Sequence, residues 1–302
     1  MTIERLTALE CVVNISEGRD LELLDVLAAA CDDALLDVHR DPDHHRSVFT
    51  LGGPAPTVEQ AARNLTATAV GRLDLTGHDG RHPRIGVVDV VPFVPLPPGP
   101  RVDLGQAGEL RPADELGPAI DARDRFAEWA GTALSLPCFL YGPLTDRPAR
   151  TLPVVRRDAF GPLRPDTGPP VPHPTAGGCA VGARPALVAY NLWLAGGDHA
   201  LARSVASAIR GPAVRALGLD LAGTFQVSCN LVRPLDIGPA DVYDQVAELL
   251  DDTDASIARC EVVGLVPAAV LDQVPARRWP ELDLRPDATI EARLGDRSLR
   301  PS

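Results

Sequence analysis

The chain has 302 residues, of which 45% are hydrophobic and 23% charged, and its formal net charge is −12 at pH 7. This length allows one large domain or two compact ones, and the acidic balance argues against nucleic acid as a partner, because phosphate binding needs clustered cations. The sequence shows no apolar run near the roughly 20 residues that cross a bilayer, no secretion signal in its first ten residues, and no Cys-x-x-Cys pair of a disulfide framework or zinc knot. We therefore expect a cytoplasmic protein that binds neither membranes nor nucleic acid.

The first part of the chain is predicted to form the element order β-α-β-β-α-β. Apolar runs rich in β-branched residues indicate strands, and apolar residues spaced by three and four after a capping side chain indicate helices. The expected elements are a strand over 9–15, a helix capped by Asp20, strands over 34–38 and 47–51, a helix from a capping box of Thr57 and Gln60 to about Leu73, and a strand over 85–91 that is ended by the prolines from Pro92 onward.

A proline-rich middle region follows. Residues 95–116 show little regular pattern, and Asp114 is expected to cap a helix that runs to about Leu136. The stretch from Arg147 to Pro174 contains eight prolines. Composition alone favours a stiff linker between two domains here.

The same β-α-β-β-α-β order then returns. The expected elements are a strand over 186–194, a helix from Asp198 that stops at Gly211-Pro212, strands over 214–219 and 224–231, a helix from Pro239 to Leu250, and a strand over 257–265. Two such units indicate an α+β fold of two ferredoxin-like α/β sandwich subdomains packed together. The structure of the tail beyond about residue 275 is left open.

Five of the seven histidines lie in the first unit, and His82 is the best candidate for proton transfer. It stands directly before a predicted strand, and Pro83 disfavours helical geometry at His82. Loops at strand ends often carry catalytic side chains, and an imidazole can take and return a proton near neutral pH. The plainer interpretation is a histidine in a solvated surface loop.

A metal site is the main alternative interpretation of the other histidines in this unit. The run of His39, Asp41, Asp43, His44 and His45 is dense in possible ligands, and His78 and His82 are four residues apart. The spacing matches no closed zinc motif, and Gly80 with Pro83 would break a helix through His82. We expect no metal and assign the run mainly to a solvated polar loop.

Two glycine-bearing turns could approach a ligand, one at Asn14–Gly18 and one at Gly168–Gly177. Neither matches a phosphate loop or a dinucleotide fingerprint. The chain has no Gly-x-Ser-x-Gly motif, and no cysteine is visibly paired with a histidine. Direct transfer between two bound substrates is therefore favoured over a covalent enzyme intermediate.

Seven motifs, in order along residues 9–271, resemble those of the glutamate formiminotransferase family. The motifs are Glu10–Arg19, Leu35–Val38, Arg81–Gly86 with Asp89–Pro95, His173–Gly177, Val181–Arg184, Gln226–Leu231 and Glu261–Pro267. The order makes the resemblance more specific than any one motif. It implies two ferredoxin-like subdomains without a cyclodeaminase, assigned to residues 1–180 and 181–275, with residues 276–302 as a tail.

The resemblance also implies an activity and a set of site residues. The family transfers a formimino group from N-formimino-L-glutamate to tetrahydrofolate, which is a co-substrate, in histidine degradation, and its members are dimers or larger. The family's catalytic histidine falls on His82, with His39, Asn14 and Arg84 in support. Its folate-binding segment falls on Gly168, Pro169, Pro170, Val171, Pro172, His173, Pro174, Thr175, Ala176 and Gly177, where composition alone favours a linker.

Some residues depart from the family pattern. His39 stands where some members have an acidic residue, and His45 replaces a common asparagine. The alternative functions are a related formimino or formyl transfer with a different amine or with 5-formyl-tetrahydrofolate, and, in other classes, a metal-dependent hydrolase or a non-catalytic folate-binding protein. In either transferase case the partners are small molecules and a second copy of the chain.

Overall fold

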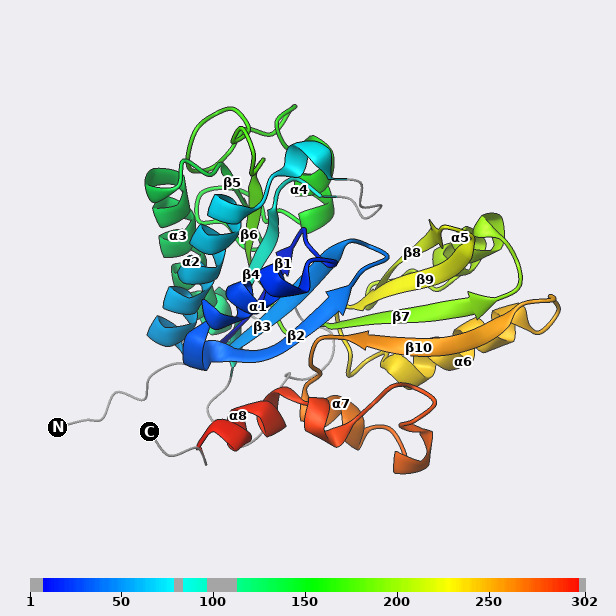
Figure 1. Cartoon of the computed structure of the whole chain (residues 1–302). Helices are drawn as coiled ribbons and strands as arrows, with labels where there is room; N and C mark the ends of the chain where they lie inside the picture. Colours follow the sequence, from blue (N-terminus) through cyan, green and yellow to red (C-terminus); the bar gives the residue numbers. More distant parts are fainter. Residues whose placement is uncertain (1–7, 79–83, 97–112, 299–302) are drawn as a thin grey trace. The chain divides into compact units, whose positions relative to one another are not determined.

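The computed structural model describes residues 8–78, 84–96 and 113–298, and it divides into two units (Figure 1). Unit 1 comprises the described residues up to Arg184, and unit 2 comprises those from Pro185 onward. Each unit has its own sheet, helices and apolar core. The chain is therefore a mixed α+β protein with two sheets.

Unit 1 contains a six-stranded mixed sheet in the order β2-β3-β1-β4-β6-β5. Its strands are β1 (Ala8–Ile15), β2 (Leu35–Asp41), β3 (Arg46–Pro54), β4 (Val88–Leu96), β5 (Cys138–Tyr141) and β6 (Cys179–Ala183). Neighbours are antiparallel from β2 to β4, whereas β4, β6 and β5 are parallel. Its helices are α1 (Leu21–Ala29), α2 (Ala55–Arg72), α3 (Ala113–Ala133) and α4 (Leu152–Asp158), with short 3₁₀ turns η1 (Asp32–Ala34) and η2 (Leu75–Gly77).

The two faces of this sheet differ because side chains alternate along a strand. One face is apolar and packs against α1, α2 and α3; it includes Leu9, Cys11 and Val13 of β1, all fully buried. The intervening residues of β1, such as Glu10 and Asn14, point to the opposite face. A smaller cluster on that face packs α4 against β5 and β6. The opposite face is thus the one that carries polar groups.

Unit 2 contains a four-stranded antiparallel sheet in the order β10-β7-β9-β8. Its strands are β7 (Val188–Ala195), β8 (Val214–Leu221), β9 (Thr224–Leu231) and β10 (Ser256–Val263). Its helices are α5 (His199–Ala208), α6 (Pro239–Leu250), α7 (Ala268–Asp272) and α8 (Ile290–Ser298), with 3₁₀ turns η3 (Ala276–Arg278) and η4 (Pro286–Ala288). Helices α5, α6 and α7 contribute to one core with the apolar face of this sheet, and the region beyond 275 adds Leu282 and Leu284 to it.

The prediction that residues 147–174 form a linker between the two units is wrong. The stretch from Arg147 to Pro174 carries α4 and lies within unit 1, because β6 follows it and pairs between β4 and β5. The units divide after Arg184, so a boundary at residue 180 would cut β6. Strands β5 and β6 are short, and their pairing is parallel and distant in sequence, which single-sequence patterns do not reveal.

Two further predictions at prolines are wrong. Strand β4 begins at Val88 and continues through Pro92 and Pro95 instead of ending there. Its pairing with β1 is interrupted between the partners of Val90 and Phe93, which accommodates a residue without an N–H donor. Helix α2 begins at Ala55 without the predicted capping box, and a proline in its first turn supplies the helical φ instead.

Within the part of the chain that the structure describes, no helix combines the length and the apolar character needed to span a membrane. All six cysteines are buried and unpaired.

Candidate functional site

Three of the sequence motifs meet in unit 1 through hydrogen bonds to backbone carbonyls. The Ser16 hydroxyl, just after β1, donates to the Gly86 carbonyl at 2.8 Å, and the Ser16 N–H donates to the Val87 carbonyl at 2.8 Å. The Val87 N–H in turn donates to the Ala176 carbonyl at 3.0 Å. The loop after β1, the entry to β4 and the end of the predicted folate segment therefore form one structure.

Glycines permit this close approach of the segments. A Cβ atom at Gly86 would lie 1.9 Å from the carbonyl oxygen of Gly178, which is far inside van der Waals contact. At Gly177 the φ angle is +69°, and a Cβ would lie 2.4 Å from the Ile85 oxygen. Because both clashes involve backbone atoms, no side-chain rotation relieves them.

Gly86→Ala is therefore expected to lower the free energy of unfolding by about 1–3 kcal/mol, since the added methyl forces the two segments apart. Gly71→Ala is the matched control, because no atom lies within 4 Å of its Cβ position; that change near the end of α2 should be neutral or stabilise by up to about 1 kcal/mol. Urea unfolding of both variants provides the measurement. Equal stability of the two would contradict the close packing of these segments.

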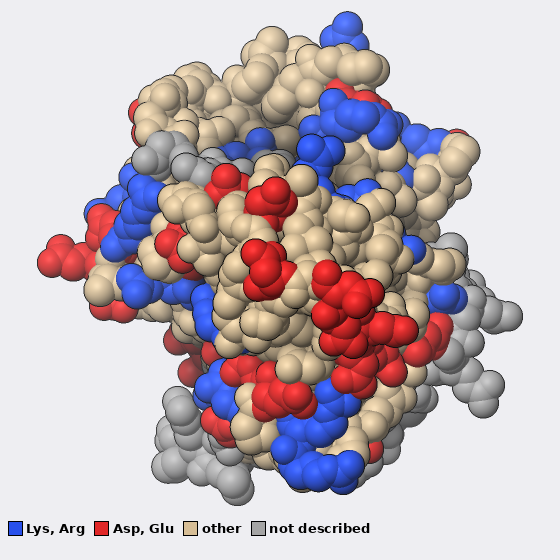
Figure 2. All heavy atoms as spheres, turned by 90° about the vertical axis from the view of Figure 1, so that its right-hand side faces the viewer, with Lys and Arg blue, Asp and Glu red and all other residues tan. Residues whose placement is uncertain are grey.

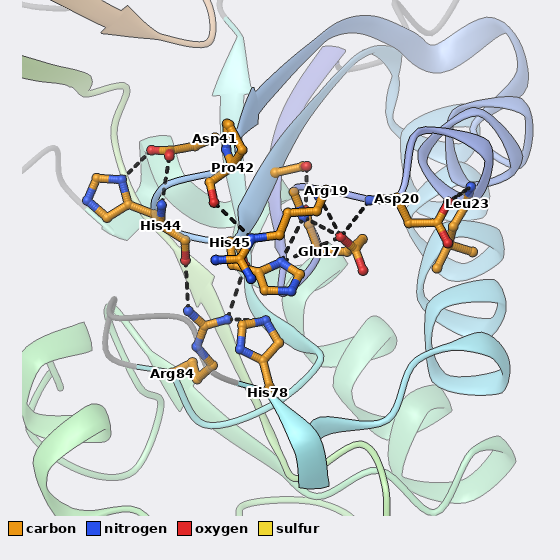
Figure 3. Close-up of polar contacts among 12 residues, drawn as sticks. Glu17, Arg19, Asp20, Leu23, Asp41, Pro42, His44, His45, His78 and Arg84 are labelled. Atoms are coloured by element: carbon orange, nitrogen blue, oxygen red, sulfur yellow. Dashed lines mark hydrogen bonds and ion pairs between the residues drawn. The ribbon is translucent and has the colours of Figure 1, made fainter. Parts of the chain in front are cut away.

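The loop after β1 is organised around the Glu17 carboxylate (Figure 3). Its Oε1 accepts hydrogen bonds from the N–H groups of Gly18, Arg19 and Asp20 at 2.8, 2.6 and 3.0 Å. Asp20 then caps α1 by accepting from the Leu23 N–H at 3.0 Å, as predicted. The Glu17 carboxylate thus already occupies the backbone N–H groups that precede the helix.

Arg84 holds two histidines and a turn together (Figure 3). Its Nη1 donates to His78 Nε2 at 2.7 Å and to the His45 carbonyl at 3.2 Å, and its Nη2 donates to the His44 carbonyl at 3.0 Å. The imidazole centroids of His45 and His78 are 4.2 Å apart. Because His78 Nε2 accepts from a cation, the neutral form of this ring carries its proton on Nδ1.

The environment of His78 lowers its pKa below the usual 6.5. Burial is the largest cause, and the charges of Arg84 and His45 add to it, while hydrogen bonds with the backbone of Ser16 and His45 oppose it. At pH values below 6.5, the His78 side chain is therefore protonated in the unfolded chain, whereas in the folded chain it stays neutral until the pH reaches its lower pKa. Stability should fall as the pH decreases from 6.5 toward the folded-state pKa.

His78→Gln should remove this part of the pH dependence, since the amide oxygen can still accept from Arg84 but does not titrate. Urea unfolding at a series of pH values around 6.5 measures the difference in slope between variant and wild type. An unchanged slope would show that the native state does not hold His78 neutral.

His45 has a φ angle of 50°, in the left-handed region where asparagine and histidine are enriched among non-glycine residues. Its Nδ1 accepts from the Gly18 N–H at 3.2 Å and lies 3.5 Å from Glu17 Oε1. A histidine is therefore compatible with this backbone conformation.

In the turn before His45, Asp41 and His44 are buried, contrary to the expectation of a solvated loop, whereas Asp43 is exposed. His44 is only 1% exposed, and Asp41 accepts from its backbone N–H at 2.8 Å and from its ring Nδ1. Burial would raise the pKa of Asp41, but the hydrogen bonds from His44 and the charges of His44 and Arg46 hold it below its ordinary value. Among the described residues, no group of three or more His, Cys, Asp or Glu side chains is arranged to bind a metal.

His39 and Asn14, predicted as supporting residues, lie on the same face of the unit 1 sheet. Both are register partners of Val48, His39 from β2 and Asn14 from β1. Two strand spacings of about 4.8 Å separate them. They flank β3 on the polar face, whereas Arg84 lies in the loop that precedes β4.

The predicted folate segment ends in a tight loop built by His173. His173 and Gly177 exchange backbone hydrogen bonds at 2.8 and 3.0 Å, and the His173 Nδ1 accepts from the N–H of Ala176 at 3.0 Å and of Thr175 at 3.3 Å. The neutral ring therefore carries its proton on Nε2. Val171, earlier in the segment, is 62% exposed, which is unusual for a large apolar side chain.

His82 itself lies outside the described residues, between His78 and Arg84 in the sequence. Sequence reasoning overlooked two residues that fix the segment after it. Asp89 accepts from the Ile85 N–H at 2.8 Å and from Arg156 Nη2 at 2.5 Å. Asp89 lies within a recognised motif, but nothing in the sequence links it to Arg156 on α4.

Comparisons with known proteins indicate the same family as the motifs. A family model described as the formiminotransferase domain, N-terminal subdomain, matches residues 8–184. The chain is 32% identical to a glutamate formimidoyltransferase of Streptococcus pyogenes, over 88% of this chain and 91% of that protein. It is 31% identical to a glutamate formimidoyltransferase of Thermoplasma acidophilum, over 89% and 91%. A formimidoyltransferase-cyclodeaminase of Dictyostelium discoideum is 30% identical over 85% of this chain, which spans 50% of that longer relative.

Proposed function

The chain belongs to the formiminotransferase family, and we propose that it transfers a formimino group from N-formimino-L-glutamate to N5 of tetrahydrofolate. The observation that carries the proposal is the similarity to two glutamate formimidoyltransferases along nearly the whole of both chains. The junction of Ser16, Gly86 and Gly177 supports it, since all three belong to motifs that resemble those of the family.

The chemistry requires one proton to move in each direction. N5 of tetrahydrofolate attacks the amidine carbon of the donor, and a tetrahedral intermediate forms. N5 then loses its proton, and the glutamate nitrogen gains one before the bond from carbon to that nitrogen breaks. We assign both transfers to His82, because an imidazole can accept a proton and return it near neutral pH. Holding two substrates in attack geometry supplies a further part of the rate.

We assign folate binding to residues 168–177. The exposed Val171 and the neighbouring prolines offer apolar surface to a planar ring, and the His173 Nε2–H is a hydrogen-bond donor. We assign supporting roles to Arg84, His39 and Asn14, of which Arg84 binds the turn at His44 and His45. The reaction as written needs no metal, since no bond has to be polarised beyond what proton transfer achieves.

We infer that each unit has the ferredoxin-like topology. In unit 1 the strands β1 to β4 have the spatial order β2-β3-β1-β4, and the four strands of unit 2 have the order β10-β7-β9-β8. With their helices, both follow β-α-β-β-α-β.

We also propose a homodimer, which light scattering tests, and a cytoplasmic location, which agrees with six unpaired cysteines.

A substrate panel tests the function and its alternatives together. Purified protein is incubated with tetrahydrofolate and one donor at a time (N-formimino-L-glutamate, another N-formimino amino acid or N-formyl-L-glutamate), and in a further reaction with 5-formyl-tetrahydrofolate and L-glutamate. Products are identified by mass spectrometry. Transfer from N-formimino-L-glutamate well above transfer from the other donors is the expected result. Preference for another amine, or consumption of 5-formyl-tetrahydrofolate instead, would assign the protein to a related reaction.

A further inference from the structure

Arg46, the first residue of β3, is a half-buried cation with one donor atom that lacks a hydrogen-bond partner. Its Nε is shut off from solvent and donates to no atom. Burial lowers the pKa of this guanidinium despite the nearby Asp41 carboxylate. A buried polar group normally has a partner, because burying it unpaired costs free energy. The Nε of Arg46 is therefore a donor that the protein's own atoms do not use.

Several other arginines form ion pairs, and among the described residues the Nε atoms of Arg63, Arg156, Arg233 and Arg293 are, like the Arg46 Nε, buried without a hydrogen-bond partner. The sequence contains no lysine, so all 29 basic residues are arginines. On the face drawn in Figure 2 they lie at the surface in small groups next to acidic side chains. Typical examples are Arg125, which binds Glu59 at 2.6 Å, and Arg157, which binds Asp158 at 2.8 Å. Arg46 makes no such pair.

Arg46 lies in a cluster of charges in unit 1. The charges that act on it are those of Asp41, Arg156, Asp89 and Arg84. Together with Arg46 itself, these are three guanidinium groups and two carboxylates, which leaves one positive charge in excess. Such an excess attracts an anion.

The carboxylates of this cluster are already engaged. Asp41 accepts from the backbone and ring of His44, and Asp89 accepts from the Ile85 N–H and from Arg156 Nη2. The Nε of Arg156, like that of Arg46, is buried without a partner. The cluster thus has two Nε–H donors without acceptors, and one positive charge that no carboxylate of the cluster balances.

We propose that Arg46 and Arg156 form a carboxylate-binding subsite that holds the amino-acid donor, an inference that rests on the proposed function. Guanidinium groups match carboxylates in shape and charge. The subsite adjoins Arg84, which binds the carbonyls of His44 and His45 directly before Arg46. In N-formimino-L-glutamate the carboxylates lie a few bonds from the reacting carbon, whereas in tetrahydrofolate a benzoyl group separates them from N5. The donor is therefore the better occupant.

Arg46→Met tests the subsite, with Arg40→Met as the matched control on the exposed side of the same hairpin. Calorimetry measures the binding of L-glutamate, the product amine, and of tetrahydrofolate separately. We expect Arg46→Met to weaken L-glutamate binding about 10- to 100-fold and to leave tetrahydrofolate binding within about two-fold. Thermal unfolding should not worsen, because Arg46 forms no hydrogen bond that the fold would lose.

A second pair, Arg156→Met and Arg157→Met, repeats the comparison on α4. Unchanged L-glutamate binding in Arg46→Met, loss of tetrahydrofolate binding in its place, or no L-glutamate binding by the wild type would each overturn the subsite.

The failure of the proposed function has a different signature. A wild type that transfers no formimino group, yet binds L-glutamate in a way that depends on Arg46, would refute the function and retain the subsite.

Discussion

His82→Ala is expected to lower formimino transfer about 10²- to 10⁴-fold while the affinity for reduced folate stays nearly unchanged. An acid–base group acts mainly in the transition state, so its removal lowers turnover and leaves ground-state binding intact. Single-turnover kinetics and equilibrium binding of tetrahydrofolate measure the two effects separately.

His82→Gln separates proton transfer from hydrogen bonding. An amide can donate and accept hydrogen bonds but cannot carry a proton through the step, so this variant should be nearly as slow as His82→Ala. His39→Ala should have a smaller effect, since His39 is proposed only as a support. If His82→Ala turns over within a few-fold of the wild type, another group carries the proton, and His39 and His45 become the first candidates.

His173→Ala is expected to weaken tetrahydrofolate binding by at least about 10-fold, because two different contributions are lost. The Nδ1 of His173 accepts from the Thr175 and Ala176 N–H groups and so shapes the loop. Its Nε2–H is left to donate to a ligand. Without the ring, the loop loses its internal acceptor and the ligand loses a donor.

His173→Asn distinguishes these two contributions. The Asn side-chain oxygen can accept from N–H groups two and three residues later, so the loop should persist. If His173 only shapes the loop, His173→Asn should bind tetrahydrofolate as the wild type does. If the Nε2–H contacts the ligand, this variant should be almost as weak as His173→Ala. Unchanged affinity in both variants would remove the segment from the folate site.

The regular elements of unit 2 were the most predictable from sequence. Strand β9 and helix α6 have the predicted bounds, because Gly223 precedes β9, Gly238 and Pro239 open α6, and the apolar periodicity of both is strong. By contrast, β5 and β6 are short strands whose partners are distant in the sequence. Tertiary pairing, and not local pattern, decides such elements.

The candidate site was predictable in its motifs but not in its contacts. The resemblance indicated the segments around Ser16, Gly86 and His173, and backbone hydrogen bonds do join them. The burial of His44 was not predictable, because it depends on a turn that brings its ring to Asp41. The sequence also gives no sign that Arg46 lacks a partner, since this depends on which strands and helices surround it.

The most direct test of the central claim is the stoichiometry of transfer by the wild-type protein. With N-formimino-L-glutamate and tetrahydrofolate together, we predict that each L-glutamate released is matched by one formimino group on N5 of the folate, as measured by mass spectrometry. Without tetrahydrofolate, release of L-glutamate should stop. Release that continues without folate would show hydrolysis, and no release in either case would show that the protein does not act on this donor; both results contradict the account.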